Sequence, residues 1–243
     1  SSAASDVYKR QALMENERMS LTMAPGGENN RGMEIIGRMP IKGEGFTAAD
    51  IEGLGPYFNK LMNASFGNRK AFVLDLNALS INQYINKLLP DEDQARVLIL
   101  RDWASQTMGA HSWTREVYKE IAPIRWDAEY LDPNKYRTEI VDGKEVRIRG
   151  KRMNKLARTN LCFVADREQK PAVFEGKGTI YDLKKLEYLN KGVEKLKEQI
   201  AAGLIDIGSK TKVIINVVEG NRYYDLKKTG IGFHGDTERV VVI

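Results

Sequence analysis

The chain has 243 residues, of which 42% are hydrophobic and 29% are charged, a composition that excludes collagen-like and wholly disordered proteins. No apolar run approaches the roughly 20 residues that cross a bilayer, and the first residues show no basic-then-apolar signal peptide. A single cysteine, Cys162, excludes intramolecular disulfides and zinc or iron–sulfur sites built from cysteine, and a net charge of +5 makes the chain mildly basic. We therefore expect an intracellular protein of the cytoplasm or nucleus, with a virus-infected host as one setting.

The first half of the chain divides into three stretches. Residues 1–11 match the translation of a sequencing-library adapter, and we interpret them as an artefact. Residues 12–50 are rich in methionine and glycine and have little apolar periodicity, which predicts a mostly flexible leader. Residues 51–122 are expected to be mainly helical, with one strand at 70–76. Ser80 and Asp91 are candidate helix caps, and the second of these helices has an apolar stripe at Ala95, Leu98, Ile99, Asp102 and Trp103.

From residue 123 onward the pattern favours strands, turns and one long helix. Asp142-Gly143 between two β-branched arms predicts a hairpin over 139–148. A helix is predicted after Asp182 as cap, ending at Gly203, and strands are expected at 212–218 and 229–236. The apolar face of the predicted helix comprises Leu183, Leu186, Leu189, Val193, Leu196 and Ile200.

The chemical pattern of greatest interest is His234-x-Asp236. Residues i and i+2 of a strand point to the same face, so this imidazole and this carboxylate can converge on one metal ion. They provide two ligands of a facial triad, which leaves positions open for a bidentate co-substrate and dioxygen. Taken alone the motif is short, and a surface turn with a capped histidine is the simpler interpretation.

The surrounding residues change this interpretation. The string Asn221-x-Tyr223, a polar loop, Gly230-Ile231-Gly232-Phe233 and His234-x-Asp236-x-Glu238 resembles the AlkB-like branch of the Fe(II)/2-oxoglutarate-dependent dioxygenases. Residues 71–76, 95–101 and 230–239 resemble more specifically the AlkB-like proteins of giant viruses, and the resemblance covers about residues 57–243.

This resemblance implies an α+β protein, in which the helical region 51–122 precedes the first part of a double-stranded β-helix, or jelly roll, in residues 123–243. It implies that His234 and Asp236 bind Fe(II), that Asn221 and Tyr223 contact 2-oxoglutarate, and that Glu238 lies near the substrate. Three structural alternatives stay open: Asn221 caps a turn, Tyr223 packs under the strand, and Glu238 ends a solvated strand.

The family also places a distal iron-binding histidine and a 2-oxoglutarate-binding arginine later in the chain than residue 243. We therefore expect the jelly roll to be incomplete at the C-terminus and this fragment itself to be inactive. His111, the other histidine, lies more than a hundred residues upstream of His234 and is not expected to be a ligand.

Basic residues are concentrated in residues 144–158. This segment contains seven lysines and arginines and one acidic residue, Glu145, which gives it a net charge of +6. Such a segment suits contacts with phosphates, and Arg147, Arg149, Lys151 and Arg152 are the candidate contacts to DNA or RNA. A solvated edge strand protected by lysine and arginine explains the charges equally well. Trp126, Tyr130 and Tyr136 precede the segment and can stack an exposed base, although core packing is the simpler reading.

Two classes of function follow. The first is an Fe(II)/2-oxoglutarate-dependent dioxygenase that demethylates N-alkylated nucleobases, with a protein or a small molecule as the alternative substrate. The second is a non-catalytic nucleic-acid-binding protein that uses the basic hairpin 139–158. The sequence predicts no membrane partner; a monomer is expected, although no residue pattern decides the oligomeric state.

Overall fold

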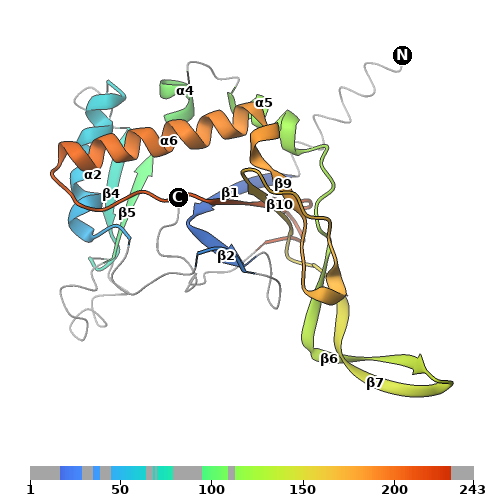
Figure 1. Ribbon diagram of the computed structural model, residues 1–243. Helices are drawn as coiled ribbons and strands as arrows, with labels where there is room; N and C mark the ends of the chain where they lie inside the picture. Colours follow the sequence, from blue (N-terminus) through green and yellow to red (C-terminus); the bar gives the residue numbers. More distant parts are fainter. Residues whose placement is uncertain are drawn as a thin grey trace, which may run out of the picture. The chain divides into compact units, whose positions relative to one another are not determined.

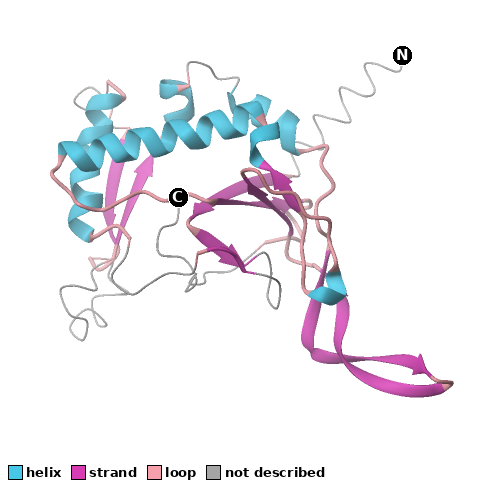
Figure 2. Cartoon of the chain, viewed as in Figure 1, coloured by secondary structure: helices cyan, strands magenta, loops and turns pink. Residues whose placement is uncertain are grey.

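The computed structural model describes residues 17–28, 35–38, 45–63, 68, 70–78, 95–108 and 113–230, which form a mixed α+β protein (Figures 1 and 2). The chain divides into two compact units, each built from separate stretches of sequence. The first unit comprises 1–41, 124–185 and 215–243, and the second comprises 42–123 and 186–214. None of the helices described combines the length and the apolar character that a bilayer crossing requires.

The first unit is built mainly from strands. Its elements are β1 (Arg18–Ala24), β2 (Gly26–Glu28), β3 (Ile35–Gly37), β6 (Glu129–Val141), β7 (Lys144–Asn154), β8 (Thr159–Val164), β9 (Ile180–Asp182) and β10 (Val217–Tyr223), with the short 3-10 helices η2 (Val173–Glu175) and η3 (Leu183–Lys185). Four of the strands form one sheet in the order β1-β10-β8-β9. The pairs β1–β10 and β10–β8 are antiparallel, whereas β8 and β9 run parallel. The central strand β10 is buried from Val217 to Asn221.

This sheet corrects the expectation of a flexible leader. Strand β1, which lies within residues 12–50, pairs with β10 along its whole length, from Arg18 opposite Tyr223 to Ala24 opposite Val217. Strand β3 also packs on the sheet, because its buried Ile36 joins a core with Cys162, Ile180 and Val217. The partners of these strands in the sheet lie between about 125 and 205 residues away in sequence, so local periodicity carried no sign of them.

The opposite face of the sheet holds aromatic side chains that require a glycine on β10. The rings of Trp126 and Phe163 meet edge to face, with centroids 6.5 Å apart. A Cβ at Gly220 would lie 2.8 Å from Trp126 Cη2 and 3.0 Å from Phe163 Cε2. Core packing of Trp126, the simpler of the two readings of this residue, is thereby confirmed, since only 7% of it is exposed.

We expect Gly220→Ala to destabilise the protein by about 1 to 3 kcal/mol, because the added methyl group overpacks a dense core. The matched control is Gly230→Ala, where a Cβ would meet no atom of the described residues within 4 Å and the change should alter stability by less than about 0.5 kcal/mol. Urea unfolding of the two variants measures the difference. Equal stability of both variants would show that the contact between Gly220 and Trp126 is not tight.

The predicted hairpin is confirmed and is longer than expected, because β6 and β7 pair from Glu129 opposite Asn154 to Val141 opposite Lys144. Asp142 and Gly143 form the turn, with φ of 51° and 74°. Positive φ at both central residues is typical of the turn whose twist matches the two strands. The pairing is irregular between Asp132 and Tyr136, where Pro133 interrupts the ladder. We call this hairpin, residues 129–154, the arm; Figure 1 shows it extending from the strands of its own unit.

The second unit is mainly helical. Its elements are α2 (Ala48–Leu61), β4 (Ala71–Asp75), β5 (Arg96–Leu100), α4 (Trp103–Thr107), α5 (Trp113–Ile121) and α6 (Glu187–Asp206). Helix α2 begins with a capping box in which Thr47 and Asp50 accept each other's backbone N–H groups. Leu54 and Phe58 of α2 are buried, and a Cβ at Gly203 of α6 would meet Leu54 and Tyr57. The two helices therefore approach closely at this glycine.

Three local predictions in this unit need correction. Residues 96–100, expected within a helix, form β5, because the run Arg-Val-Leu-Ile-Leu pairs with the predicted strand at 71–75. Helix α6 is capped by Glu120 of α5, which accepts from the N–H groups of Tyr188 and Leu189, and not by Asp182. It continues past Gly203 to Asp206, and Gly208, with φ of 72°, ends it. The expected boundary near residue 123 agrees with the division between the units, but α6 returns to the second one.

Candidate functional site

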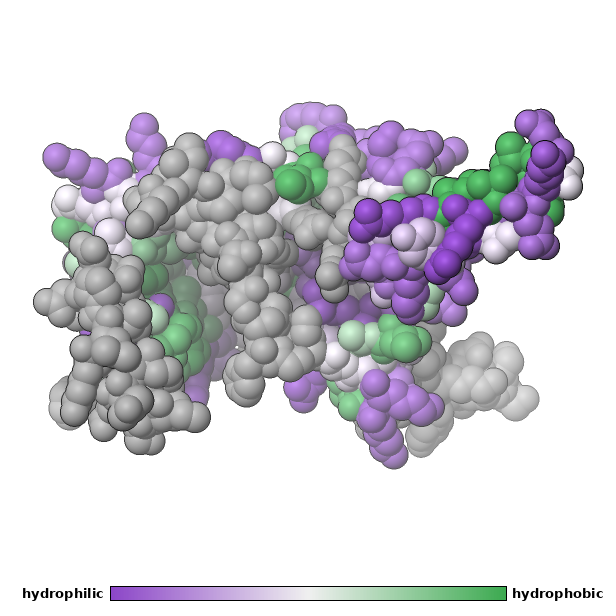
Figure 3. All heavy atoms as spheres, turned by 90° about the horizontal axis from the view of Figure 1, so that it is seen from below, coloured by the Kyte–Doolittle hydropathy of each residue, from purple (hydrophilic) through white to green (hydrophobic). Residues whose placement is uncertain are grey.

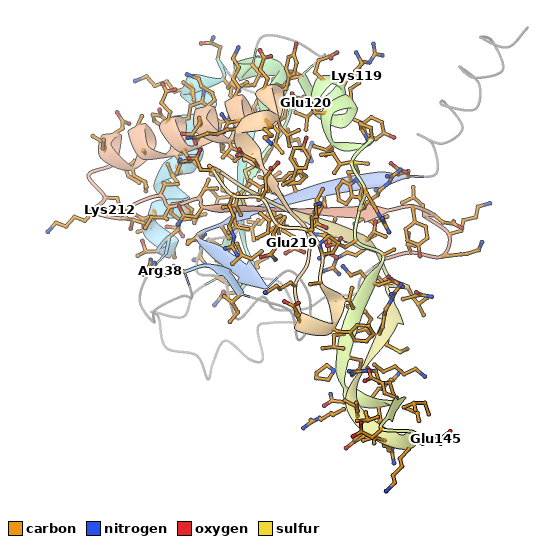
Figure 4. All side chains as sticks on the ribbon, turned by 45° about the vertical axis from the view of Figure 1, so that its right-hand side comes forward. Arg38, Lys119, Glu120, Glu145, Lys212 and Glu219 are labelled. Carbon is orange, nitrogen blue, oxygen red and sulfur yellow. The ribbon has the colours of Figure 1, made fainter. Side chains whose placement is uncertain are left out.

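Polar side chains gather on one face of the four-stranded sheet, around β10. The register places Glu219 opposite Cys162 and Asn221 opposite Asn160, so these four residues share a face. Two cations from the connection between β7 and β8, Lys155 and Arg158, join them. We call this group the polar cluster; it comprises Asp127, Lys155, Arg158, Asn160, Glu219 and Asn221. Figure 4 labels Glu219 among the strands of the unit.

The two amides of the polar cluster are held by the two cations. Lys155 Nζ donates to Asn160 Oδ1 at 2.5 Å, and Arg158 Nε donates to Asn221 Oδ1. An Arg158 terminal nitrogen also lies 4.0 Å from a carboxylate oxygen of Glu219, of whose side chain only 6% is exposed. Because Asn221 accepts through Oδ1, its Nδ2 group is oriented away from Arg158 and can donate to another group. Among the residues that the structure describes, Nδ2 of Asn221 has no partner.

Asp127 fixes the loop that borders the cluster. Its carboxylate accepts from the backbone N–H and the hydroxyl of Thr179, each at 2.6 Å, and its backbone pairs with Asn160. Together with Glu219 it provides two buried anions for the two cations. The polar cluster therefore has no net charge when all four groups are ionised, which is the usual requirement for charges removed from water.

Burial lowers the pKa of Lys155 to about 8, an effect that the nearby carboxylates of Asp127 and Glu219 oppose and the Arg158 cation reinforces. The side chain is only 8% exposed, so the charged form loses most of its hydration. With a pKa of about 8, this lysine is mostly charged at pH 7 and mostly neutral at pH 9. Such groups concentrate at functional sites, although structural ion-pair networks contain them as well.

This pKa predicts how stability depends on pH. Below pH 8 the folded and the unfolded chain both carry a protonated Lys155, and burial of the cation disfavours folding. Between pH 8 and the usual value of 10.5 the unfolded chain keeps a proton that the folded chain has released, so stability rises with pH. Relative to Lys155→Met, we expect the wild-type chain to gain about 2 to 3 kcal/mol between pH 7 and pH 10. Parallel stability curves of the two proteins would contradict this assignment.

The sequence-predicted contacts to 2-oxoglutarate lie at the end of β10. Asn221 is buried in the polar cluster, and Tyr223, two residues later, lies on the same face of the strand and is half-buried. Asn221 therefore caps no turn, which removes one of the alternatives left open by the sequence. Tyr223 is opposite Arg18 of β1.

The chain that leaves β10 is fixed beside the polar cluster. A turn closes from Asp225, whose carbonyl accepts from the N–H groups of Lys228 and Thr229, and the N–H of Gly230 then donates to the Ala157 carbonyl at 3.0 Å. Ala157 directly precedes Arg158.

His234, Asp236 and Glu238 themselves lie outside the described residues, as does His111. Within the stretches that the structure describes, no group of three or more His, Cys, Asp and Glu side chains is arranged to hold a metal ion.

The candidate phosphate contacts all lie on β7 of the arm, and their surroundings differ. The Arg147 guanidinium stacks on Tyr136, 4.1 Å from the ring centroid, and Tyr136 is 47% exposed rather than part of the core. Arg149 Nε donates to the Pro133 carbonyl at 2.7 Å, and Arg152 pairs with Glu129 at 2.7 Å. Lys151 has no hydrogen-bond or ion-pair partner in the described part of the chain. Tyr136, Arg147 and Lys151 line an open groove of about 430 Å³ on this face of the arm.

The structure divides the basic segment 144–158 into two parts. Lys155 and Arg158, which the sequence groups with the exposed cations, belong to the polar cluster. The other five basic residues of the segment lie on β7 of the arm. Strand β6 contributes two more basic residues and three acidic ones: Lys135, Arg137, Glu129, Asp132 and Glu139. The interrupted hydrophobicity of β8 and β10, with Asn160, Glu219 and Asn221 inside buried strands, was the available sign of the polar cluster in the sequence.

Comparisons with known proteins give one similarity. No protein-family model matches the chain, and no solved structure matches it. An uncharacterized protein of Acanthamoeba polyphaga mimivirus is 27% identical over 227 residues, which are 93% of this chain and 72% of the mimivirus protein. The chain is thus similar over almost its entire length to a protein of a giant virus.

Proposed function

We propose that the chain carries part of an AlkB-like Fe(II)/2-oxoglutarate-dependent dioxygenase that removes N-alkyl groups from nucleobases of DNA or RNA. In this proposal β10 is a strand of the expected jelly roll, and the residues after Gly230 lead into the iron site. The supporting observation is the Asn221 amide, which Arg158 holds with its Nδ2 group unpartnered among the described residues. Asn221 lies on β10, and the chain that follows β10 is held next to Arg158 by the hydrogen bond from the Gly230 N–H to the Ala157 carbonyl.

The residues at the end of β10 suit one carboxylate of 2-oxoglutarate. Asn221 Nδ2 and the Tyr223 hydroxyl are two donors on one face of a strand, and carboxylate oxygens accept such bonds. The cations of the polar cluster are already balanced by Glu219 and Asp127. We therefore assign the contact with the ligand to Asn221 and Tyr223, and assign to Arg158 the task of orienting the Asn221 amide.

His234 and Asp236 are the proposed iron ligands, because a histidine and an aspartate at i and i+2 of a strand share a face. With dioxygen, Fe(II) and 2-oxoglutarate supply the oxidation that hydroxylates the C–H bond next to nitrogen, with succinate and CO2 as co-products. The hydroxylated alkyl group then leaves the base as an aldehyde. The chain's own residues bind and orient the co-substrate and exclude water from it.

The arm is the proposed binding surface for nucleic acid. Exposed cations on β7 suit phosphates, and Tyr136, exposed at the groove, suits stacking of an unpaired base. A base must leave the duplex, or come from a single strand, before its N-alkyl group can reach an iron site. We therefore propose a single-stranded or locally opened nucleic acid as the substrate.

The second candidate is a protein that binds nucleic acid through the arm and has no catalytic role. The exposed Lys151 and the stacked pair of Arg147 and Tyr136 favour it, since they require no iron site. Binding of 2-oxoglutarate separates the two candidates.

Ligand-observed NMR with 2-oxoglutarate and Zn(II), used as a redox-inert substitute for Fe(II), tests the proposal on the full-length protein. We expect saturation transfer from the protein to 2-oxoglutarate, and its loss in Asn221→Ala. The matched control is Asn216→Ala, the same change at an exposed position just before β10. An absence of transfer in the wild-type chain, or equal transfer in Asn221→Ala, would favour the non-catalytic candidate.

A further inference from the structure

The outer edge of β6 is unpaired within the part of the chain that the structure describes, since β6 and β7 form a sheet of two strands. A two-stranded ribbon is marginally stable by itself in water, and a long unpaired edge is a template for pairing with another strand. The helix η2 packs on the middle of the arm, where the Arg137 guanidinium lies 4.7 Å from the centre of the Phe174 ring. Between Arg137 and the turn, the arm has no such support from the other described residues.

The turn determines which backbone groups this edge presents. In a hairpin with a two-residue turn, the closing pair, Val141 and Lys144, exchanges hydrogen bonds, and the pairs then alternate along the ladder. Tyr136, Thr138 and Ile140 therefore occupy the pairs that are not hydrogen-bonded to β7. Their N–H and C=O groups point outward from β6, as three donors and three acceptors at regular spacing.

Apolar side chains are exposed along the same part of the arm. Ile140 is 67% exposed, Val141 45% and Val146 40%, in addition to Tyr136. Figure 3 shows apolar and hydrophilic residues side by side on the arm, at the right of the view. Isolated exposed apolar residues are ordinary, but four of them on one ribbon with an unpaired edge indicate a surface that pairs with protein.

The charges of β6 suit a second copy of the same strand. Arg137 and Glu139 flank Thr138 and form an ion pair of 2.5 Å within the chain. If two β6 strands pair in antiparallel fashion about Thr138, Arg137 of each copy lies opposite Glu139 of the other. The same register places Tyr136 opposite Ile140, and the outward backbone groups of Tyr136, Thr138 and Ile140 meet their counterparts. One register thus pairs the outward backbone groups, sets opposite charges against each other and brings apolar side chains together.

Strand β7 does not offer an equivalent edge. Its outward residues are Glu145, Arg147 and Arg149, and a symmetric pairing about Arg147 would set two arginines directly opposite each other. Five basic residues against one acidic residue on each copy add to this repulsion. Lysine and arginine on an edge strand are a common protection against such pairing.

We propose that two copies of the chain associate through β6, edge to edge about Thr138, to form a four-stranded antiparallel sheet. This interface replaces the monomer that the sequence led us to expect, and its residues Tyr136 and Thr138 also line the groove of the arm. The regularly paired edge from Tyr136 to Val141 is about 17 Å long. Since so short an edge provides less than roughly 1,000 Å², we expect a weak dimer with a dissociation constant of about 10 to 100 µM.

Sedimentation velocity over about 1 to 200 µM protein tests this interface. Thr138→Pro removes an outward N–H without removing a bond to β7, and we expect it to raise the dissociation constant at least about tenfold. Glu139→Lys sets a lysine opposite Arg137 of the second copy and should have a similar effect. The matched control is Glu145→Lys, the same charge change on β7, which should leave association unchanged. Circular dichroism shows whether each variant keeps its strands.

Two outcomes would overturn the proposal. One is a wild-type chain that stays monomeric up to the highest concentration. The other is a dimer that tolerates Thr138→Pro and Glu139→Lys but dissociates in Glu145→Lys, which would assign the interface to β7. Neither outcome bears on 2-oxoglutarate binding, because the β6 edge contributes no residue to the polar cluster.

Discussion

Replacing His234 or Asp236 by alanine in the full-length protein should abolish Fe(II) binding and succinate formation, whereas His111→Ala should change neither. The two residues share one face of the expected strand, and each supplies a ligand that the other cannot replace. Loss of residues that only orient a ligand already costs about 10- to 100-fold in metal affinity, so loss of a ligand should cost more. Anaerobic equilibrium dialysis with Fe(II) measures the affinity.

The control histidine makes this a sharp test. His111 is the only other histidine in the chain, so any loss caused by its replacement would show that it takes part in the site. Equal loss of iron binding in His111→Ala and His234→Ala would overturn the assignment. If both His234→Ala and Asp236→Ala still bind iron, the iron site is formed by other residues.

Replacing Arg147, Arg149, Lys151 and Arg152 by alanine should flatten the salt dependence of binding to single-stranded oligonucleotides. Each lost phosphate contact lowers the log–log slope by about 0.7, so four contacts lower it by up to about 2.8. Between about 50 and 200 mM salt, wild-type affinity should then fall about 50-fold more than that of the variant. Arg147→Ala with Lys151→Ala should account for most of this change, because Arg149 and Arg152 bind groups of the arm itself.

The matched control replaces two exposed lysines of η3, Lys184 and Lys185, which pair with Asp166 and Glu168. They belong to the same unit as the arm, and their removal lowers the net charge as the double variant does. Fluorescence anisotropy at several salt concentrations gives the slopes. If none of these replacements changes the slope, β7 makes no phosphate contacts, and its basic residues are explained as the protection of a solvated edge strand.

Local sequence patterns predicted the elements whose partners are close in sequence. Asp142-Gly143 predicted the arm, because a turn with positive φ at both positions specifies its own two strands. The strand at 71–75 was likewise predicted from its apolar run. Its partner β5 was missed, since Leu98, Ile99 and Asp102 also fit a helical spacing, and only the pairing with β4 decides between the two.

The polar cluster was beyond the reach of such patterns. Asn221 and Tyr223 were singled out through a resemblance, and Glu219 lies two residues before Asn221 on the same strand. Asn160 becomes their neighbour only through the pairing of β8 with β10. Lys155 and Arg158 were counted among the exposed cations, because a charge run does not show where the chain turns inward. The pairing of β1 with β10 was missed for the same reason, since it joins the two ends of the described chain.

Turnover by the full-length protein tests the proposed function most directly. The protein is supplied with Fe(II), 2-oxoglutarate, dioxygen and a single-stranded oligonucleotide that contains an N-methylated base. We predict that succinate and formaldehyde form in equal amounts, and that both disappear in Asn221→Ala and His234→Ala. Binding of the oligonucleotide without any succinate would contradict the proposal and leave a nucleic-acid-binding protein that acts through its arm.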